Sequence, residues 1–221
     1  MKFLINSIFI ISLIGTFLFF YSCKKDDDNT IIIQGKIIDA NQNIAVANAE
    51  VTFWSSRIQS GTYNPNYIAI ASAITDAGGN YNLQITKAKD AGFRITIEKP
   101  KYFGQTTDIS VENLPAGTNT LNYSIYPEAY FKLIVKNISF VDNNDFISYW
   151  FKNTQPSGAN CCNNVQTNYT GQSYSNTIKC RTFGGQNMIV KWIVKKDNVT
   201  TPYESSVYCV PFDTTVFNLN Y

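Results

Sequence analysis

Apolar residues recur along this chain in short runs, many of them alternating with polar residues, and this pattern constrains the fold more than any other feature. Alternation is typical of β-strands, because neighbouring side chains point to opposite faces of a sheet. After Thr30, no stretch of a dozen residues keeps the i, i+3, i+4, i+7 spacing of an amphipathic helix. Asn, Asp, Gly and Thr interrupt the runs, as expected of turns. The pattern therefore predicts an all-β protein.

The strand-like segments fall into two groups, on either side of Pro127. The first group comprises residues 31–39, 49–54, 67–75, 80–86, 93–99, 106–110 and 119–126. The second group comprises residues 130–141, 147–152, 175–183, 187–195, 206–212 and 216–220. Residues 57–66 are expected to form an enlarged loop. Many short strands separated by turn residues favour two consecutive β-sandwich domains, at 31–127 and 128–221.

The first 22 residues have the layout of an export signal. Lys2 precedes an apolar run that extends to Phe20, and the chain becomes polar directly after Ser22 and Cys23. A positive charge, an apolar segment and a small residue at the cleavage point are typical of a secretory signal peptide. The alternative is an uncleaved anchor, because an apolar run of this length can just span a bilayer.

The residues around Cys23 resemble a bacterial lipoprotein signal. The resemblance implies cleavage between Ser22 and Cys23 and attachment of fatty acids such as palmitate to Cys23. Each buried methylene contributes about 0.8 kcal/mol, so one acylated cysteine can hold a protein on a membrane. Residues 23–30 would form a polar tether, whose Lys-Lys-Asp-Asp-Asp string resembles a surface-export signal of some Gram-negative lipoproteins. The implied location is the outer membrane facing the cell surface, or otherwise the periplasm.

Several motifs in the first group of strands resemble the carboxypeptidase regulatory-like domains. They are the Gly-Lys-Ile-Ile-Asp string at 35–39, the segment 44–52, the turn and strand at 75–83 and, more weakly, 93–102. The turn contains Gly, which accepts positive φ, and Asp, which caps its own backbone. The resemblance covers residues 31–127. It implies a prealbumin-like β-sandwich that serves as a non-catalytic spacer or docking module on an exported protein.

If Cys23 is acylated, four of the five cysteines remain, all in the second group of strands. An exported compartment permits disulfides. The neighbours Cys161 and Cys162 cannot bond to each other without strain, so we expect two disulfides that join them to Cys180 and Cys209, with the pairing left open. A four-thiolate metal site is the alternative, but CxxC spacing is absent.

The sequence contains no histidine, which excludes His-dependent catalytic triads, His metal ligands and His proton shuttles. Lys and Arg number 18 against 16 Asp and Glu, without a basic block, so nucleic acid is not an expected partner. Asp142 and Asp145 form an acidic patch that could hold calcium, but EF-hand spacing is absent and a solvated turn is expected. We therefore expect no catalytic residue, no cofactor and no metal; a carboxylate-based glycosidase is the remaining enzyme alternative.

Trp54 and Trp150 are the candidate ligand-binding residues. Alternation places both rings on the outer faces of their strands, whereas Trp192 is expected to be buried. The expected core residues of the two strands are Ala49, Val51, Phe53, Ile147, Tyr149 and Phe151. Flat aromatic faces stack on sugar rings or anchor protein interfaces. A loop or the other domain covering each ring is the alternative.

Two functions are consistent with these features. The first is a membrane-anchored lipoprotein with a non-catalytic binding or structural role at the cell envelope, where its partner is an envelope protein or a glycan. The second is a glycan-capturing or carbohydrate-active lipoprotein of an outer-membrane nutrient-uptake system. A glycan role predicts an exposed Trp54 or Trp150 beside carboxylates or amides, and a structural role predicts covered rings.

Overall fold

The computed structural model describes residues 29–59, 61–152, 159–161 and 165–221. The expected signal peptide, the lipidation site Cys23 and most of the tether lie outside these residues. Within the described part, the regular elements are strands apart from one 3-10 turn, Val111–Asn113. The all-β prediction is confirmed. No helix among these residues is long and apolar enough to cross a membrane.

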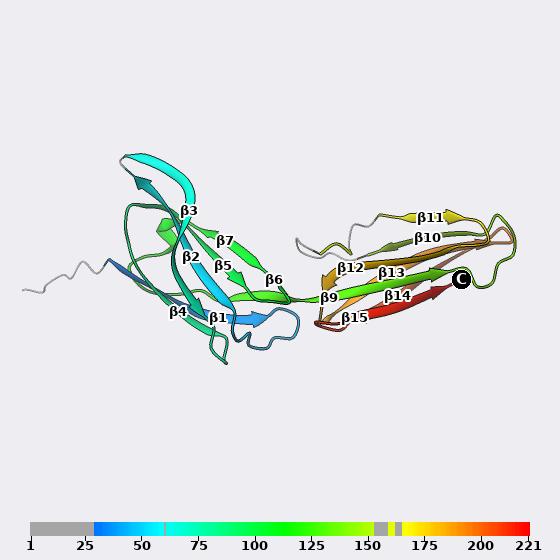
Figure 1. The fold of residues 1–221 in the computed structure, drawn as a ribbon, viewed down its shortest axis with the longest axis horizontal. Coiled ribbons are helices and arrows are strands. Elements are labelled where there is room, and N and C mark those ends of the chain that lie inside the picture. Colours follow the sequence, from blue (N-terminus) through cyan, green and yellow to red (C-terminus); the bar gives the residue numbers. More distant parts are fainter. Residues whose placement is uncertain (1–28, 60, 153–158, 162–164) are drawn as a thin grey trace, which may run out of the picture.

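The N-terminal β-sandwich has two layers (Figure 1). One sheet has the order β3-β2-β5-β7, formed by Thr62–Ile74, Glu50–Gln59, Asp90–Glu98 and Gln105–Ile109. The other layer contains β1 (Thr30–Asp39), β4 (Asn80–Thr86), β6 (Tyr102–Phe103), β8 (Gly117–Thr120) and the first part of β9 (Tyr123–Lys136). Ile33, Phe53 and Phe93 belong to the buried cluster between the layers. This cluster is the core of the first sandwich.

The C-terminal β-sandwich also has two layers. One sheet has the order β11-β10-β13-β14, formed by Thr167–Thr170, Phe146–Phe151, Gln186–Lys196 and Val199–Cys209. The other layer contains the second part of β9, flanked by β12 (Ser175–Phe183) and β15 (Thr214–Asn220). Phe131 of β9 meets Phe151 of β10 edge-on across the core, with ring centroids 5.8 Å apart.

Strand β9 belongs to both sandwiches. Its first residues pair in parallel with β1, and its residues from Glu128 onward pair with β12 and β15. Pro127, the expected domain boundary, lies inside this strand. Ile125 belongs to the first buried cluster and Ala129 to the second. The two sandwiches are therefore joined by continuous strand rather than by a coil linker.

The joint between the sandwiches is filled by aromatic side chains. Phe183, at the end of β12, is only 1% exposed. Its ring centroid lies 4.2 Å from that of Phe103 and 4.5 Å from that of Tyr126. Tyr102 and Phe212 form a further contact at 5.2 Å. Because aromatic pairs contribute about 0.5–1.5 kcal/mol each beyond their buried area, these contacts resist bending at the joint.

Polar contacts fix the joint in register. The Asn41 side-chain amide donates to the carbonyl of Gly184 at 2.7 Å. The buried Asp39 carboxylate accepts the backbone N–H of Asn41 at 2.9 Å, which holds this turn in place. Arg181 forms an ion pair with Glu128, and its guanidinium lies over the ring of Phe103. A Cβ atom at Gly184 would lie 2.5 Å from Pro211 Cα, so only glycine permits this approach.

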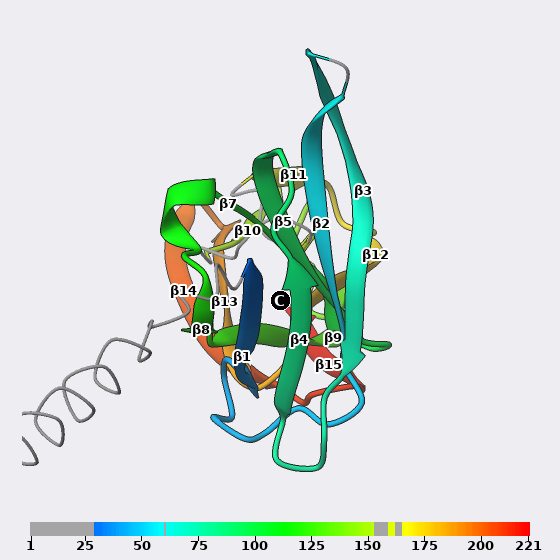
Figure 2. The same cartoon turned by 90° about the vertical axis from the view of Figure 1, so that its left-hand side faces the viewer.

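Residues 57–66 do not form the expected loop. Strand β2 continues to Gln59 and β3 begins at Thr62, so the two strands form a long arm that projects beyond the sandwich (Figure 2). The segment resembles a turn because it contains Asn and Pro65. It lies on an edge strand, however, where a proline is tolerated because the outer side of the ladder is unpaired.

Two strand predictions in the second half differ from the structure. β11 is a strand that the alternation did not indicate, and β14 begins at Val199, seven positions before the predicted start at Ser206. Both segments are rich in Thr, Ser and Tyr, whose side chains are mostly exposed or half-buried here. They form strands because they hydrogen-bond to β10 and β13, and a pattern of apolar residues does not indicate such pairing.

One disulfide joins Cys161 to Cys180. Cys209 carries a free, buried thiol, so the expectation that it would form a second disulfide is wrong. Cys162 lies outside the described residues. Cys161 is already bonded to Cys180 of β12, and Cys209 ends β14 on the opposite sheet with its side chain enclosed in the core. Burial raises the pKa of the Cys209 thiol to about 11, which keeps it protonated and unreactive.

Candidate functional site

Trp54 lies on the outer face of the β3-β2-β5-β7 sheet. Val51 and Phe53 on the same strand are fully buried, as alternation predicts, and Trp54 is half-buried. Its indole N–H donates to Thr96 Oγ1 of the neighbouring strand at 2.9 Å. The hydrogen bond draws the indole sideways over the sheet, so the ring is held in one orientation. A fixed, partly exposed ring is suited to stacking.

A shallow depression of about 610 Å³ surrounds Trp54. Its lining includes Glu50, Thr52, Ala69, Ser72, Thr96 and Glu98. Strand β3 contributes Ala69 and Ser72, whose side chains are small, together with the larger Ile70. Glu50 and Glu98 stand directly opposite each other in the β2–β5 ladder, an arrangement of like charges that is unfavourable by itself. Hydroxyls, carboxylates and one aromatic ring thus share this face, which we call the Trp54 face.

The other end of the Trp54 face is bounded by Arg94. Its guanidinium donates to both carboxylate oxygens of Asp108, at 2.5 and 3.0 Å, and lies 4.1 Å from the centroid of the Tyr67 ring. The hydrogen bond from Arg94 holds the pKa of Asp108 below its ordinary value. Arg94 and Asp108 therefore pair with each other beside Trp54, whereas Glu50 and Glu98 line the depression itself.

Trp150 lies in the other sandwich and does not join the Trp54 face. Ile147, Tyr149 and Phe151 are buried as predicted, and Trp150 is half-buried on the outer side, opposite Lys191 of β13. Ser148, on the same outer side, is only 4% exposed, whereas Lys152 at the end of this side is exposed. The two candidate rings therefore belong to separate surfaces.

Trp192 was expected to be buried, but the structure shows that it is only partly buried. It faces the second core but lies at its margin, half-exposed, where it stacks on Tyr203 of β14 with centroids 5.4 Å apart. Phe217 of β15 covers another part of the ring at 6.0 Å. The alternation gave the correct face, and the position at the edge of the core decides the exposure.

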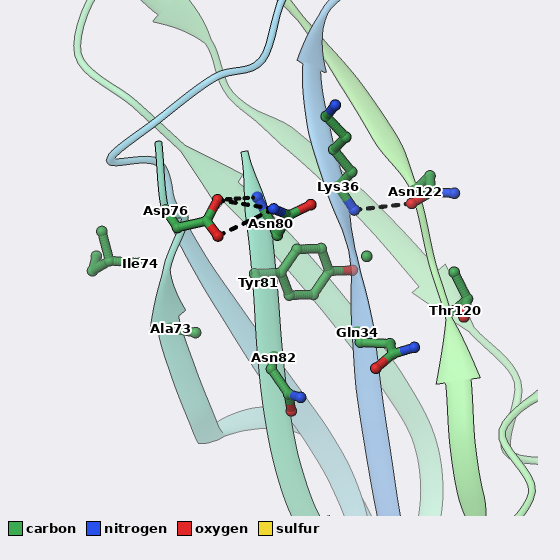
Figure 3. Close-up of a pocket in the computed structure, with 11 residues that line it drawn as sticks. Gln34, Lys36, Ala73, Ile74, Asp76, Asn80, Tyr81, Asn82, Thr120 and Asn122 are labelled. Atoms are coloured by element: carbon green, nitrogen blue, oxygen red, sulfur yellow. Dashed lines mark hydrogen bonds between the residues drawn. The ribbon is translucent and has the colours of Figure 1, made fainter. Parts of the chain in front are cut away.

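A second depression, of about 520 Å³, lies on the outer side of β4, β1 and β8 (Figure 3). Its lining is rich in amides and hydroxyls, from Gln34, Asn80, Asn82, Thr120 and Asn122, with Lys36 as a cation. The backbone N–H of Lys36 donates to Asn122 Oδ1 at 2.9 Å. The Tyr81 ring points to the core, because its hydroxyl donates to a backbone carbonyl at 2.7 Å. This surface can form hydrogen bonds but offers no exposed ring for stacking.

The acidic patch at 142–145 is not a solvated turn throughout. Asp145 is fully buried, and its carboxylate accepts the Asn137 side-chain amide at 2.9 Å and the Val141 N–H at 3.0 Å. Asp142 instead caps the N–H of Asn144. The Asp145 oxygens are therefore occupied by donors. In the described part of the chain, no group of three or more His, Cys, Asp or Glu side chains is arranged to hold a metal ion.

Comparisons with known proteins do not assign a family. No family model matches this chain, and no curated protein matches it. Among solved structures, the shaft pilin SpaA from Lactobacillus rhamnosus GG is 7% identical, over 86% of this chain and 97% of that chain, with a TM-score of 0.33. The Streptococcal ancillary pilin is 11% identical, over 88% and 63%, with a TM-score of 0.32.

A third structure, the 3-chlorocatechol 1,2-dioxygenase from Rhodococcus opacus 1CP, is 16% identical over 46% of this chain, with a TM-score of 0.35. This chain spans 61% of the dioxygenase chain. Identities and TM-scores at this level carry no argument about function.

Proposed function

We propose that the protein is a lipid-anchored, non-catalytic lipoprotein of the outer membrane, which acts as a rigid spacer and displays its C-terminal sandwich at the cell surface. Cys23 is the proposed attachment point, because it follows an apolar signal and precedes a polar tether. The resemblance of residues 31–127 to carboxypeptidase regulatory-like domains supports the spacer role.

The joint is the observation that carries this proposal. A protein that displays a module needs a fixed distance between its anchor and that module. Here β9 continues from one sandwich into the other, and Phe183 is packed between Phe103 and Tyr126. The chain enters β1 near one end of the long axis, and its C-terminus lies at the other end (Figure 1). Anchoring through Cys23 would therefore leave the second sandwich farthest from the membrane.

Metabolic labelling with a palmitate analogue tests the anchor. The wild-type protein is expected to incorporate the label and to partition with membranes, whereas Cys23→Ala should do neither. Mass spectrometry that finds residues 1–22 retained and an unmodified Cys23 would overturn the proposal. Protease treatment of intact cells separates the two locations, since only a surface-exposed C-terminal sandwich would be degraded.

A glycan-binding role is the second candidate, and the Trp54 face is the observation that favours it. Trp54 is held by Thr96 beside Glu50 and Glu98, so a ring that can stack on a sugar lies next to carboxylates that can accept hydrogen bonds from its hydroxyls. A glycan array probed with the purified protein tests this role. Binding that is lost in Trp54→Ala and kept in Trp150→Ala would support it, and an array without any binding would exclude it.

A further inference from the structure

Three polar side chains meet at the end of the C-terminal sandwich farthest from the joint. Asn137 directly follows β9, Asp145 directly precedes β10, and Lys196 is the last residue of β13. The Lys196 amine lies 3.0 Å from Asn137 Oδ1. The Asn137 amide nitrogen donates to Asp145 Oδ2 at 2.9 Å. The three side chains thus form a chain of contacts in the order amine, amide, carboxylate.

This cluster is largely shielded from water. Asp145 is fully buried, Asn137 is 9% exposed and the Lys196 side chain is 18% exposed. The Tyr221 ring covers the amine, with its centroid 5.0 Å from Lys196 Nζ. In such surroundings an ion pair loses much of its advantage over a neutral amine beside a carboxylic acid. Hydrogen bonds from Asn137 and the Val141 N–H favour the ionised form of Asp145, so the transfer of a proton from Lys196 that the reaction requires is a brief, uphill step.

The position of the amine differs from that of a simple ion pair. Lys196 Nζ is 3.8 Å from Asp145 Oδ2 but 3.0 Å from the Asn137 carbonyl oxygen. The carbonyl and hydroxyl oxygens of Ser139 also accept hydrogen bonds from the amine and hold it there. The carboxylate contacts the same amide at its nitrogen. The Lys196 amine, a potential nucleophile, thus lies at the carbonyl end of the Asn137 amide. The Asp145 carboxylate, a potential proton carrier, lies at the nitrogen that would leave.

We propose that Lys196 and Asn137 join in an intramolecular isopeptide bond, with Asp145 as the proton carrier. Asp145 takes a proton from the Lys196 ammonium, and the amine lone pair attacks Asn137 Cγ. The bond between Cγ and Nδ2 then breaks, and Asp145 delivers its proton to the departing nitrogen. One C–N bond forms, one C–N bond breaks and one ammonia leaves, so the step needs no oxidant or reductant. The fold supplies the proximity that a reaction between free groups lacks.

The bond would have a structural consequence. Asn137 ends the strand that runs through both sandwiches, whereas Lys196 and Asp145 adjoin strands of the opposite sheet. The cross-link would therefore join the two layers of the C-terminal sandwich covalently at its outer end. Its formation does not depend on the location or the partner of the protein.

Peptide mapping of the natively purified full chain tests the proposal. After reduction, denaturation and trypsin digestion, the peptide 137–152 is expected to be joined to the peptide 196–221, because trypsin does not cleave after an acylated Lys196. The joined species should be lighter than the sum of the two peptides by one ammonia, about 17 Da. Separate peptides, with cleavage after Lys196, would overturn the proposal. An ammonia loss confined to peptide 137–152 would indicate a succinimide at Asn137 and would also overturn it.

Matched variants identify the roles of the three residues. Lys196→Arg keeps the positive charge and should release the two peptides, as should Asn137→Ala. Asp145→Asn keeps the size of the side chain but cannot accept the proton, so the joined peptide should be lost or strongly reduced. Circular dichroism establishes that each variant is folded. If Asp145→Asn folds and still yields the full amount of joined peptide, Asp145 is not the proton carrier.

Discussion

Tyr126 of β9 stacks on Phe183 of β12, with ring centroids 4.5 Å apart and planes 16° from parallel. Tyr126 lies where β9 leaves the first sandwich, and Phe183 lies where β12 ends in the second. The contact therefore couples the orientation of one sandwich to that of the other. It does so beside a backbone that already runs through both, so bending would have to break packing as well as strand pairing.

Phe183→Ala is expected to destabilise the protein by about 3–5 kcal/mol, because it removes a buried ring and leaves a cavity between Phe103 and Tyr126. The variant should also widen the distribution of angles between the sandwiches. Urea unfolding measures the first effect and small-angle X-ray scattering the second. Val216→Ala, at an exposed position on β15, is the control and should change stability by less than about 0.5 kcal/mol. Unchanged unfolding and scattering for Phe183→Ala would show that this ring does not stiffen the joint.

Gly35→Ala is expected to be severely destabilising. A Cβ atom at Gly35 would lie 1.8 Å from the carbonyl oxygen of Leu121, at the point where β1 exchanges β8 for β9 as its parallel neighbour. We expect a loss of at least about 3 kcal/mol or failure to fold, measured by thermal and urea unfolding. Gly104→Ala is the matched control, since its new Cβ would meet nothing closer than 3.5 Å. Equal stability of the two variants would contradict the close approach.

The thiol of Cys209 is expected to resist alkylation in the native protein. It is fully buried, and burial raises its pKa to about 11, so little thiolate is present near neutral pH. Iodoacetamide should not modify Cys209 in the folded protein, but denaturation alone should make this thiol reactive. Cys161 and Cys180 should react only after a reductant has broken their disulfide. Peptide mass spectrometry reads each cysteine separately. Finding Cys209 in a disulfide with Cys162 would contradict the free thiol.

Acid stability should report the state of Asp145. Burial alone would raise the pKa of Asp145, but hydrogen bonds from Asn137 and the backbone N–H of Val141 outweigh it and bring the pKa below its ordinary value of 3.8. A carboxylate whose pKa is depressed in the folded state contributes stability above the unfolded pKa and loses it as pH falls through the folded value. The free energy of unfolding should therefore decline below about pH 4.

The comparison that isolates this effect uses the Lys196→Arg background, in which the proposed cross-link cannot form. Urea unfolding across the acidic range should show a steeper decline for Lys196→Arg than for the Lys196→Arg, Asp145→Asn double variant. The double variant lacks the titrating carboxyl, so its remaining slope comes from the other acids. Identical slopes would mean that the pKa of Asp145 is the same in the folded and unfolded chains.

Local pattern predicted much of the fold. Alternation placed Val51 and Phe53 in the core and Trp54 outside, because the side-chain period of a strand is set by its own backbone. The same reasoning gave the face of Trp192 but not its exposure. The Trp54 face needed the pairing of β2 with β3 and β5, since its carboxylates, hydroxyls and small residues come from three strands.

The strand content, the inner and outer faces and the absence of histidine chemistry could therefore be predicted, because all of them are properties of short segments or of composition. The tertiary structure decided which segments meet. Only the fold pairs Cys161 with Cys180 and leaves Cys209 free, and only the fold brings Lys196 to Asn137, 59 positions apart. Contacts of that kind depend on which strands become neighbours. The packing of the whole chain determines these neighbours, and the alternation of apolar residues within one strand does not specify them.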